Sequence, residues 1–371
     1  MTKDYLKEFE ELNTTTRSIY DLEEFDVLII LKDGTNLTSW NNVKREDVIY
    51  ISEDLSNITN VTRRYAGFRY LRAIIAFGLN SHVEYTISMF EGCAYLKDIS
   101  GLSNLDVSNV KDMGNMFNGC EFLESLNGLN DWDVSRVKNM EGMFKGCWYL
   151  KDISSLRKWN TSKLENMENM FAKCEHLTEL SNLENWEVSK VKNMKSIFNM
   201  GTSYSGDLED ISALSKWDVS NVEDMSNMFQ SSRKLSDLAG IKDWNVSNVK
   251  NMHGMFCRCN ALVELTSIKD WDVSNVENMS YMFYGCDGLT DLGGLSDWDV
   301  SKVKNMRGMF DMDYISSYKP SYDLSGLEKW DVGNVRDMSY MFRCNGFIDL
   351  ASLKEWNVSN VRNMGHMFMW C

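Results

Sequence analysis

The chain has 371 residues, of which 43% are hydrophobic, and its 54 acidic and 39 basic residues give a formal net charge of −15. A surface this acidic repels nucleic-acid phosphates and anionic lipids and favours a protein partner with a basic surface, or cations, over direct binding to nucleic acid; the alternative is that the charge only keeps a large protein soluble. No run of 18 or more apolar residues occurs, so we expect no membrane-spanning helix.

Residues 1–75 are predicted to form a small α+β domain that caps the rest of the chain. Residues 26–31 and 47–52 are each predicted to form a strand, with a turn at 32–34. Residues 56–79 have the apolar spacing of an amphipathic helix. The concentrated basic patch of the chain lies on this segment and consists of Arg63, Arg64, Arg69 and Arg72. An anionic partner would explain these arginines, but contacts with the acidic remainder of the chain are the simpler interpretation.

Residues 76–371 are filled by a phrase of about 27 residues. The copy that starts at Trp271 reads WDVSNVENMSYMFYGCDGLTDLGGLSD. The copies begin at Leu105, Trp132, Trp159, Trp186, Trp217, Trp244, Trp271, Trp298, Trp330 and Trp356. A degenerate earlier copy covers residues 89–102. A fixed period of this length predicts a solenoid, in which each unit buries its apolar face only by stacking on its neighbours.

A single copy predicts the structure of each coil. In the copy that starts at Trp132, four apolar residues at offsets 0, 3, 4 and 7 have the spacing of one face of a helix over two turns, and they are Met140, Met143, Phe144 and Cys147. The leucine-type residues that follow at intervals of three favour a short extended segment. The side chain of the residue before the first Met, such as Asn139, is expected to form a ladder that bonds to the backbone between coils. We therefore expect an α/β solenoid of the leucine-rich-repeat type, with about ten to eleven coils that each contain a short strand and a short helical turn.

Eight of the nine cysteines recur at one slot of the repeat, where Cys344 is shifted by one residue. These eight are Cys93, Cys120, Cys147, Cys174, Cys259, Cys286, Cys344 and Cys371. Thiols in phase with the repeat predict small buried side chains and no disulfide framework. The pair Cys257-x-Cys259 is a weak metal signal without a second pair nearby, so we expect no metal and no cofactor. Because the first 25 residues also lack the apolar core of a secretory signal, we expect a cytoplasmic protein, or a surface protein only if an anchor or another export route exists.

The phrase W-[DN]-V-S-N-V-x-N-M-x-x-M-F-x-x-C-x-x-L-x-x-L-x-x-L resembles the BspA-like branch of leucine-rich-repeat proteins. This branch includes the Met-Phe-rich repeat of mycoplasma and other bacterial surface proteins. The resemblance covers about residues 83–371. It implies a leucine-rich-repeat-like superhelix with a binding role, typically in adhesion or host contact.

Two insertions interrupt the repeat directly after its Phe, at residues 199–207 and 311–322. Their tyrosines are Tyr204, Tyr314, Tyr318 and Tyr322. Tyrosine, serine and glycine are typical of adaptable binding loops, because tyrosine supplies contact area at a low entropic cost. Surface loops also tolerate neutral insertions, and we favour the binding interpretation.

An acidic side chain recurs in the L-x-[DE]-L step, where only Ser125 breaks the series. The residues proposed for partner binding are Asp152, Glu179, Asp210, Asp237, Glu264 and Asp291. Stacked coils would bring these carboxylates to about 5 Å from one another, so their repulsion must be offset. Hydrogen bonds from turn amides would offset it, and so would the lysines after the second Val, namely Lys138, Lys192, Lys250 and Lys304. The alternative is an acidic stripe that binds a basic partner or cations.

No catalytic motif accompanies the four histidines, so we expect a non-catalytic protein-binding solenoid that presents an acidic face and two Tyr-rich loops. One alternative is a bacterial surface adhesin whose anchor is absent from this chain. A second alternative is an acidic decoy that mimics nucleic acid and sequesters a basic protein.

The C-terminal coil carries a separate prediction. The given sequence stops shortly after a Met-Phe step, so we expect Met341, Phe342 and the Trp356 layer to be partly exposed. Exposed apolar edges favour association, which predicts that this end is covered by a second copy or by a partner, the alternative being that it frays.

Overall fold

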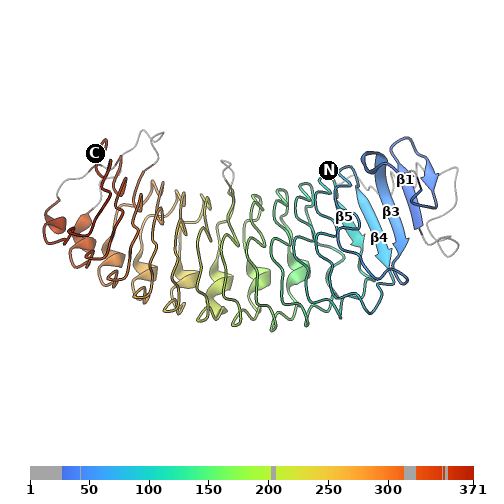
Figure 1. Cartoon of the computed structure of the whole chain (residues 1–371), viewed down its shortest axis with the longest axis horizontal. Coiled ribbons are helices and arrows are strands. Elements are labelled where there is room, and N and C mark those ends of the chain that lie inside the picture. The colour runs from blue at the N-terminus through green and yellow to red at the C-terminus, as the bar shows by residue number, and fades with distance from the viewer. Residues whose placement is uncertain (1–26, 42, 202–205, 313–322, 345, 347–349) are drawn as a thin grey trace.

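The computed structural model describes residues 27–371 except residue 42 and residues 202–205, 313–322, 345 and 347–349. The described chain forms a long curved rod of stacked coils, with the N-terminal strands at one end and residue 371 at the other (Figure 1). The predicted repeat solenoid is therefore confirmed. No helix in the described ranges is long and apolar enough to cross a membrane.

A five-stranded sheet forms the N-terminal end of the rod. Its strands are β1 (Val27–Leu31), β2 (Asn36–Leu37), β3 (Val48–Asp54), β4 (Ala73–Phe77) and β5 (Asp98–Gly101), in the order β2-β1-β3-β4-β5. β1 pairs antiparallel with β2 and β3, whereas β4 pairs in parallel with β3 and β5. A 3-10 helix, η2 (Arg45–Asp47), precedes β3. The two strands predicted in this region are confirmed, and the sheet runs directly into the coils.

The helix predicted over residues 56–79 is wrong, because this segment consists of turns followed by β4. Its backbone bonds to the next coil: the Tyr65 amide donates to the Met89 carbonyl at 2.9 Å, as the Phe90 amide donates to Met116 at 2.8 Å. The Tyr65 ring also stacks on Phe90 with centroids 5.2 Å apart. Tyr65 thus occupies the Phe slot of a coil, and the apolar spacing that indicated a helix is the spacing of the repeat itself.

The Met-Phe step is not helical in the later coils either, which corrects the prediction made for Met140 to Cys147. It is a series of turns in which Gly142 and Gly146 have φ of 58° and 72°. The Phe144 amide donates to the Met170 carbonyl of the next coil at 2.9 Å, where an α-helix would require a partner four residues earlier. Successive tight turns return these side chains to one side of the chain, so the side chains share a face as in a helix without its hydrogen bonds.

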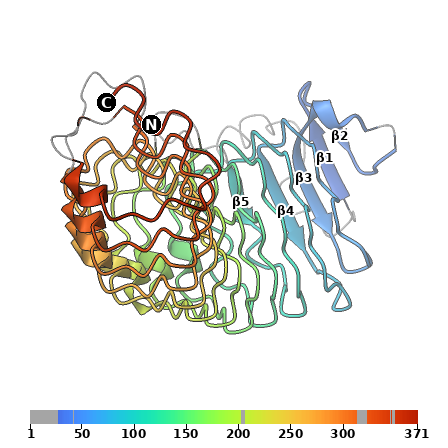
Figure 2. The ribbon, with the colours of Figure 1, turned by 60° about the vertical axis from the view of Figure 1, so that its left-hand side comes forward.

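Short helices occur instead in the Leu-x-x-Leu segment, which was expected to be extended. All have 3-10 geometry and all except η9, which follows Asp323, begin directly after a leucine or isoleucine. From η3 to η9 each contributes at least one buried side chain. They are η3 (Ser154–Leu156), η4 (Ser181–Leu183), η5 (Ser212–Lys216), η6 (Ala239–Ile241), η7 (Thr266–Ile268), η8 (Gly293–Leu295), η9 (Leu324–Leu327) and η10 (Ala351–Leu353). Figure 2 shows helices of neighbouring coils stacked along one edge of the rod.

The core consists of columns of equivalent side chains. The Phe144 ring lies parallel to the rings of Phe117 and Phe171, with centroids 5.7 and 5.6 Å away. The Cys147 thiol is fully buried and donates to the Phe117 carbonyl of the preceding coil at 3.3 Å. Burial raises the pKa of Cys147, which keeps this thiol protonated and unreactive. The column cysteines are core side chains as expected, except for Cys371, which is exposed in the last coil.

The prediction of exposed Met341 and Phe342 is wrong, because both are fully buried. The Phe342 amide donates to the Met367 carbonyl at 3.0 Å, and its ring stacks on Phe368 with centroids 5.7 Å apart. The half-buried Trp356 agrees with the prediction. The exposed apolar residues of the final coil are Val358, Met364, Phe368 and Trp370. Self-association through this coil stays a prediction.

Candidate functional site

The predicted acidic column is present on the surface, and its carboxylates bond to turns. Oδ1 of Asp152 accepts a hydrogen bond from the Ser154 amide at 2.9 Å, at the start of η3. The equivalent hydrogen bond, from the backbone amide two residues further along the chain, is accepted at 2.6–2.7 Å by the carboxylates of Glu179, Asp210, Asp237 and Asp291. Glu264 accepts instead from the Thr266 hydroxyl at 2.7 Å. The turn-amide alternative therefore describes most of this column, although every residue except the half-buried Glu179 is exposed.

Three of the four lysines expected to neutralise the acidic column pair with other carboxylates. Lys138 pairs with Glu165 at 2.8 Å and Lys250 pairs with Glu223 at 2.7 Å. These glutamates occupy the lysine's own slot in a neighbouring coil, so lysine neutralisation of the acidic column is wrong for these pairs. Backbone hydrogen bonds between coils bring equivalent slots together, and a side chain therefore meets its own column first.

The N-terminal arginines are also partly explained by contacts within the chain. Arg64 forms an ion pair with Glu53, a residue of β3, and Arg63 pairs with Glu91 of the next coil at 2.8 Å. This agrees with the intramolecular interpretation for two of the four arginines.

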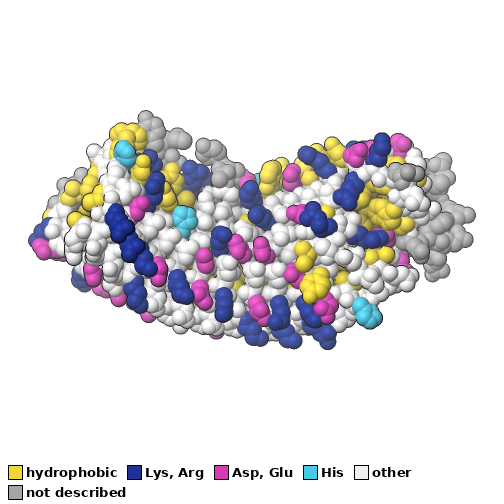
Figure 3. Space-filling model, viewed as in Figure 1, with side chains coloured by type: hydrophobic (Ala, Val, Ile, Leu, Met, Phe, Trp, Pro, Cys, Tyr) yellow, Lys and Arg dark blue, Asp and Glu magenta, His cyan; other side chains and the backbone are white. Residues whose placement is uncertain are grey.

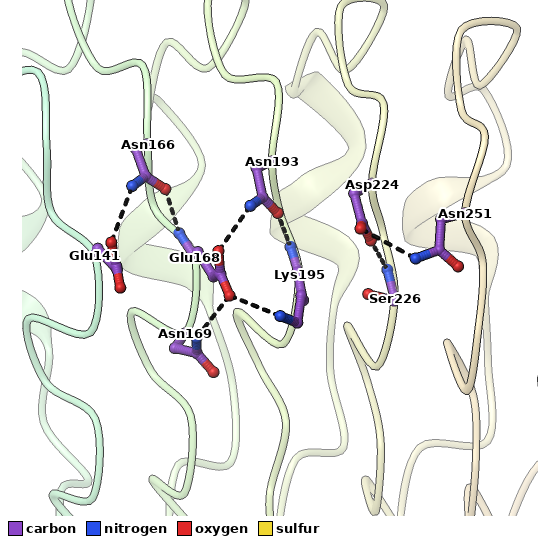
Figure 4. A network of polar contacts seen from close by, with 9 residues as sticks. All are labelled: Glu141, Asn166, Glu168, Asn169, Asn193, Lys195, Asp224, Ser226 and Asn251. Atoms are coloured by element: carbon purple, nitrogen blue, oxygen red, sulfur yellow. Dashed lines mark hydrogen bonds and ion pairs between the residues drawn. The ribbon is translucent and has the colours of Figure 1, made fainter.

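The Asn and Asp residues before the first Met form a ladder along the rod. Nδ2 of Asn139 donates to Oδ1 of Asp112 at 2.9 Å, and Nδ2 of Asn251 donates to Oδ2 of Asp224 at 3.0 Å. Figure 4 shows the central part, where Glu168 accepts from Asn193 at 2.8 Å and pairs with a lysine. A ladder is present, but its side chains bond to side chains of neighbouring coils and to the amide two residues further along their own coil, whereas bonds to the backbone of neighbouring coils were predicted. The ladder fixes the register between neighbouring coils along this column.

A groove lies beside this ladder over the C-terminal half of the rod. It has a volume of about 630 Å³ and is continuous with a shallower hollow of about 510 Å³. Its side chains come from the Met-Phe steps of successive coils and are mainly aromatic and basic. The lining includes Tyr281, Tyr284, Tyr340, Arg258, Arg307 and Arg343.

Arg307 is held between two tyrosines in this groove. Its guanidinium lies 5.9 Å from the ring centroid of Tyr281 and 5.0 Å from that of Tyr340, and its Nε donates to the Tyr281 hydroxyl at 2.6 Å. This hydrogen bond raises the pKa of Arg307. Arg343 also lies over Tyr340 and forms an ion pair with the buried Asp311 at 2.8 Å. The aromatic and cationic groups therefore support one another in fixed positions.

The two central tyrosines occupy a slot whose backbone is left-handed throughout the repeat. Tyr281 and Tyr340 have φ of 56° and 61°, in a slot where other coils place Gly142, Asn115 or Gly254. The left-handed region is strained for a bulky side chain, and such strain concentrates at functional sites. Most coils fill this slot with Gly, Asn or Ser, and the bulky exceptions in the described residues are Tyr281, Tyr340, His366 and Arg63. Two tyrosines in this slot are the sequence signal that could have revealed this groove.

The tyrosines predicted to bind a partner (Tyr204, Tyr314, Tyr318 and Tyr322) lie outside the described residues. Asp311, the first residue of the second insertion, lines the groove.

Catalytic chemistry has little support in this groove. His253 Nδ1 lies 2.8 Å from the Ser280 hydroxyl, but that hydroxyl is buried and donates to Asn278. Burial lowers the pKa of His253. In the described ranges no carboxylate bonds to the second imidazole nitrogen, and no three His, Cys, Asp or Glu residues could hold a metal ion. The pair thus lacks the orienting third group of a catalytic triad.

Comparison with known proteins identifies the repeat. The family model DUF285, described as a Mycoplasma protein of unknown function, matches residues 59–175, 84–212, 203–317 and 311–371. No curated protein sequence matches the chain.

Two solved structures are similar to the chain. One is a leucine-rich repeat protein from Bacteroides ovatus, with 15% identity, coverage of 79% of this chain and 85% of that one, and a TM-score of 0.18. The other is a leucine rich cell surface protein from Faecalibacterium prausnitzii, with 13% identity, coverage of 75% and 87%, and a TM-score of 0.27.

Proposed function

The chain belongs to the DUF285 family, of BspA-like leucine-rich-repeat type, and on that premise we propose that it is a non-catalytic solenoid that binds a protein partner along one face. A solenoid offers an extended surface, and its neighbouring coils can each contribute one or two contact residues.

The groove around Arg307 carries this proposal. Tyrosine and arginine are enriched at the energetic centres of protein interfaces, where they fill pockets and combine apolar area with directed hydrogen bonds. Tyr281 and Tyr340 are held in place by Arg307, so little side-chain freedom is lost when a partner binds. Gly, Asn or Ser fills the same left-handed slot in most other coils, so the two tyrosine rings are not required for the coils to stack.

The acidic column and the two insertions extend the proposed contact surface. The exposed carboxylates of Asp152, Asp210 and Asp237 would attract a partner with a basic surface and accelerate its approach. The Tyr-rich insertion at residues 311–322 would add contact area next to the groove, because its first residue, Asp311, lines it. The N-terminal sheet would cap the first coil.

The place of action is a separate proposal. The BspA-like resemblance favours contact at a cell surface, whereas the repeat-phased thiols favour a reducing compartment. Fractionation of the native host with antibody detection distinguishes the two, because a protease-accessible surface pool would exclude a purely cytoplasmic role.

The binding proposal is tested with groove variants. We expect Arg307→Ala and Tyr340→Ala each to weaken binding to a partner captured from the native host by at least tenfold, measured with the purified partner. Tyr149→Ala is the matched control, because Tyr149 is an exposed tyrosine, 39% accessible, outside the groove. Equal affinity of the groove variants and the control would exclude the groove as the binding site.

A further inference from the structure

A column of charged side chains follows the second Val of each coil. From Lys111 to Arg362 its members are Lys111, Lys138, Glu165, Lys192, Glu223, Lys250, Glu277, Lys304, Arg336 and Arg362. Four ion pairs join neighbouring coils along it, from Lys111 with Glu84 at 2.5 Å to Lys304 with Glu277 at 2.7 Å. In Figure 3, dark blue and magenta side chains alternate along the rod.

The alternation ends over the last coils, where three cationic residues follow one another. The Arg336 amide donates to the Lys304 carbonyl at 2.9 Å and the Arg362 amide to the Arg336 carbonyl at 2.8 Å, so these residues occupy consecutive coils. With Lys302 they line a hollow of about 560 Å³. We name these four residues the basic stack. Figure 3 shows dark blue side chains gathered at this end of the rod.

The basic stack contains more positive charge than its surroundings neutralise. Glu277 is the one acidic residue in the lining, and it already pairs with Lys304. Arg336 and Arg362 are exposed, and in the part of the chain that the structure describes neither pairs with a carboxylate. Residues 298–371 carry nine basic and nine acidic residues, so the whole net charge of −15 lies in residues 1–297.

Like charges stacked in this way repel one another. Neighbouring extended segments lie about 4.8 Å apart, and like charges directly opposite each other destabilise the pairing. From Lys138 to Lys304 the same slot is filled by alternating charge, so one glutamate at residue 336 would remove the repulsion. A ligand with regularly spaced negative charges would remove it as well.

We propose that the basic stack binds an acidic segment of a partner protein, with successive carboxylates lying along Lys304, Arg336 and Arg362. Arginine guanidinium groups match carboxylates in a planar, two-bond geometry. A long nucleic acid is disfavoured because it would extend over the acidic remainder of the rod. This surface shares no residue with the groove around Arg307, and the inference does not depend on the proposed function.

The test uses the full chain and a fluorescent octaglutamate peptide at an ionic strength of about 50 mM. We expect saturable binding that weakens steeply with salt and loses at least tenfold in affinity in Arg336→Glu. The same variant places a glutamate between two cations, so its Tm should be equal to that of the natural protein or slightly higher. Lost binding at undiminished stability separates a ligand site from a structural role.

Lys138→Glu is the matched control, because it changes the net charge equally in the same column but outside the basic stack. It breaks the pair with Glu165, so we expect a slightly lower Tm and unchanged peptide binding. Equal losses of affinity in the two variants would mean that overall charge alone attracts the peptide, and the proposal would fail. It would also fail if the peptide did not bind, or if a single-stranded oligonucleotide of equal charge bound more tightly with the same dependence on Arg336.

Discussion

The position of the Tyr281 ring in the groove can be tested by substituting Gly308, which lies against the ring. A methyl group at Gly308 would lie 2.6 Å from Cε1 of the Tyr281 ring, and Gly308 itself has φ of 57°. Gly308→Ala therefore introduces backbone strain of about 1 kcal/mol and an overlap whose relief costs about 1–3 kcal/mol. We expect a total loss of about 2–4 kcal/mol in the free energy of unfolding.

The overlap disappears when the ring is removed. In a Tyr281→Gly background we expect Gly308→Ala to cost only about 1 kcal/mol, so that the two substitutions couple by about 1–3 kcal/mol. Gly34→Ala is the control for strain alone, because Gly34 has φ of 85° and no atom lies within 4 Å of the added carbon. Its expected cost is about 1 kcal/mol.

The assay is equilibrium unfolding in urea, followed by tryptophan fluorescence, on the natural protein, both single variants and the double variant. Equal m-values across the four proteins make their free energies comparable. Additive effects, with a coupling below about 0.3 kcal/mol, would show that the Tyr281 ring does not lie on Gly308 and would refute the geometry proposed for the groove.

The remaining predictions concern the core, the insertions and pH. Phe229 is fully buried between two stacked rings, so Phe229→Ala should cost about 3–5 kcal/mol; a loss below about 1 kcal/mol would contradict the column core. Tyr204→Ala combined with Tyr318→Ala should weaken partner binding while stability changes by less than about 0.5 kcal/mol, and unchanged affinity would remove the insertions from the contact surface. Burial lowers the pKa of His253, so the unfolded chain takes up a proton first as pH falls, and the stability contributed by neutral His253 is present above the unfolded pKa of about 6.5 and lost at lower pH. The urea midpoint should therefore fall less between pH 7 and pH 5 in His253→Gln than in the natural protein, and an equal fall in both would contradict this assignment.

The sequence alone determined the repeat and the core residues. The slots of Trp132, Phe144 and Cys147 recur at a fixed period, and a side chain that recurs in register must meet its equivalents once the coils stack. All three are buried, and they lie in continuous columns. The strands β1 and β3 were also predictable, because alternating β-branched and aliphatic residues carry that information locally.

The hydrogen bonds of each coil could not be read from the same pattern. Offsets of 0, 3, 4 and 7 describe a helix face, but they also describe a chain of tight turns whose amides bond one coil further on. The partner of the Phe144 amide is Met170, 26 residues away, and local periodicity does not contain that information. For the same reason Tyr65 was assigned to a helix although it fills a Phe slot.

Tertiary structure changed the interpretation of the acidic column, and it also created two candidate sites that the sequence did not predict. The acidic column was visible in the sequence, but only the fold showed that Asp152 bonds to a turn amide and that the lysines pair within their own column. Arg307 lies between Tyr281 and Tyr340 because three different coils stack, and the basic stack exists because Arg336 follows Lys304 across a coil boundary. The period of a repeat determines which side chains are buried. The register between coils determines which side chains lie next to each exposed residue.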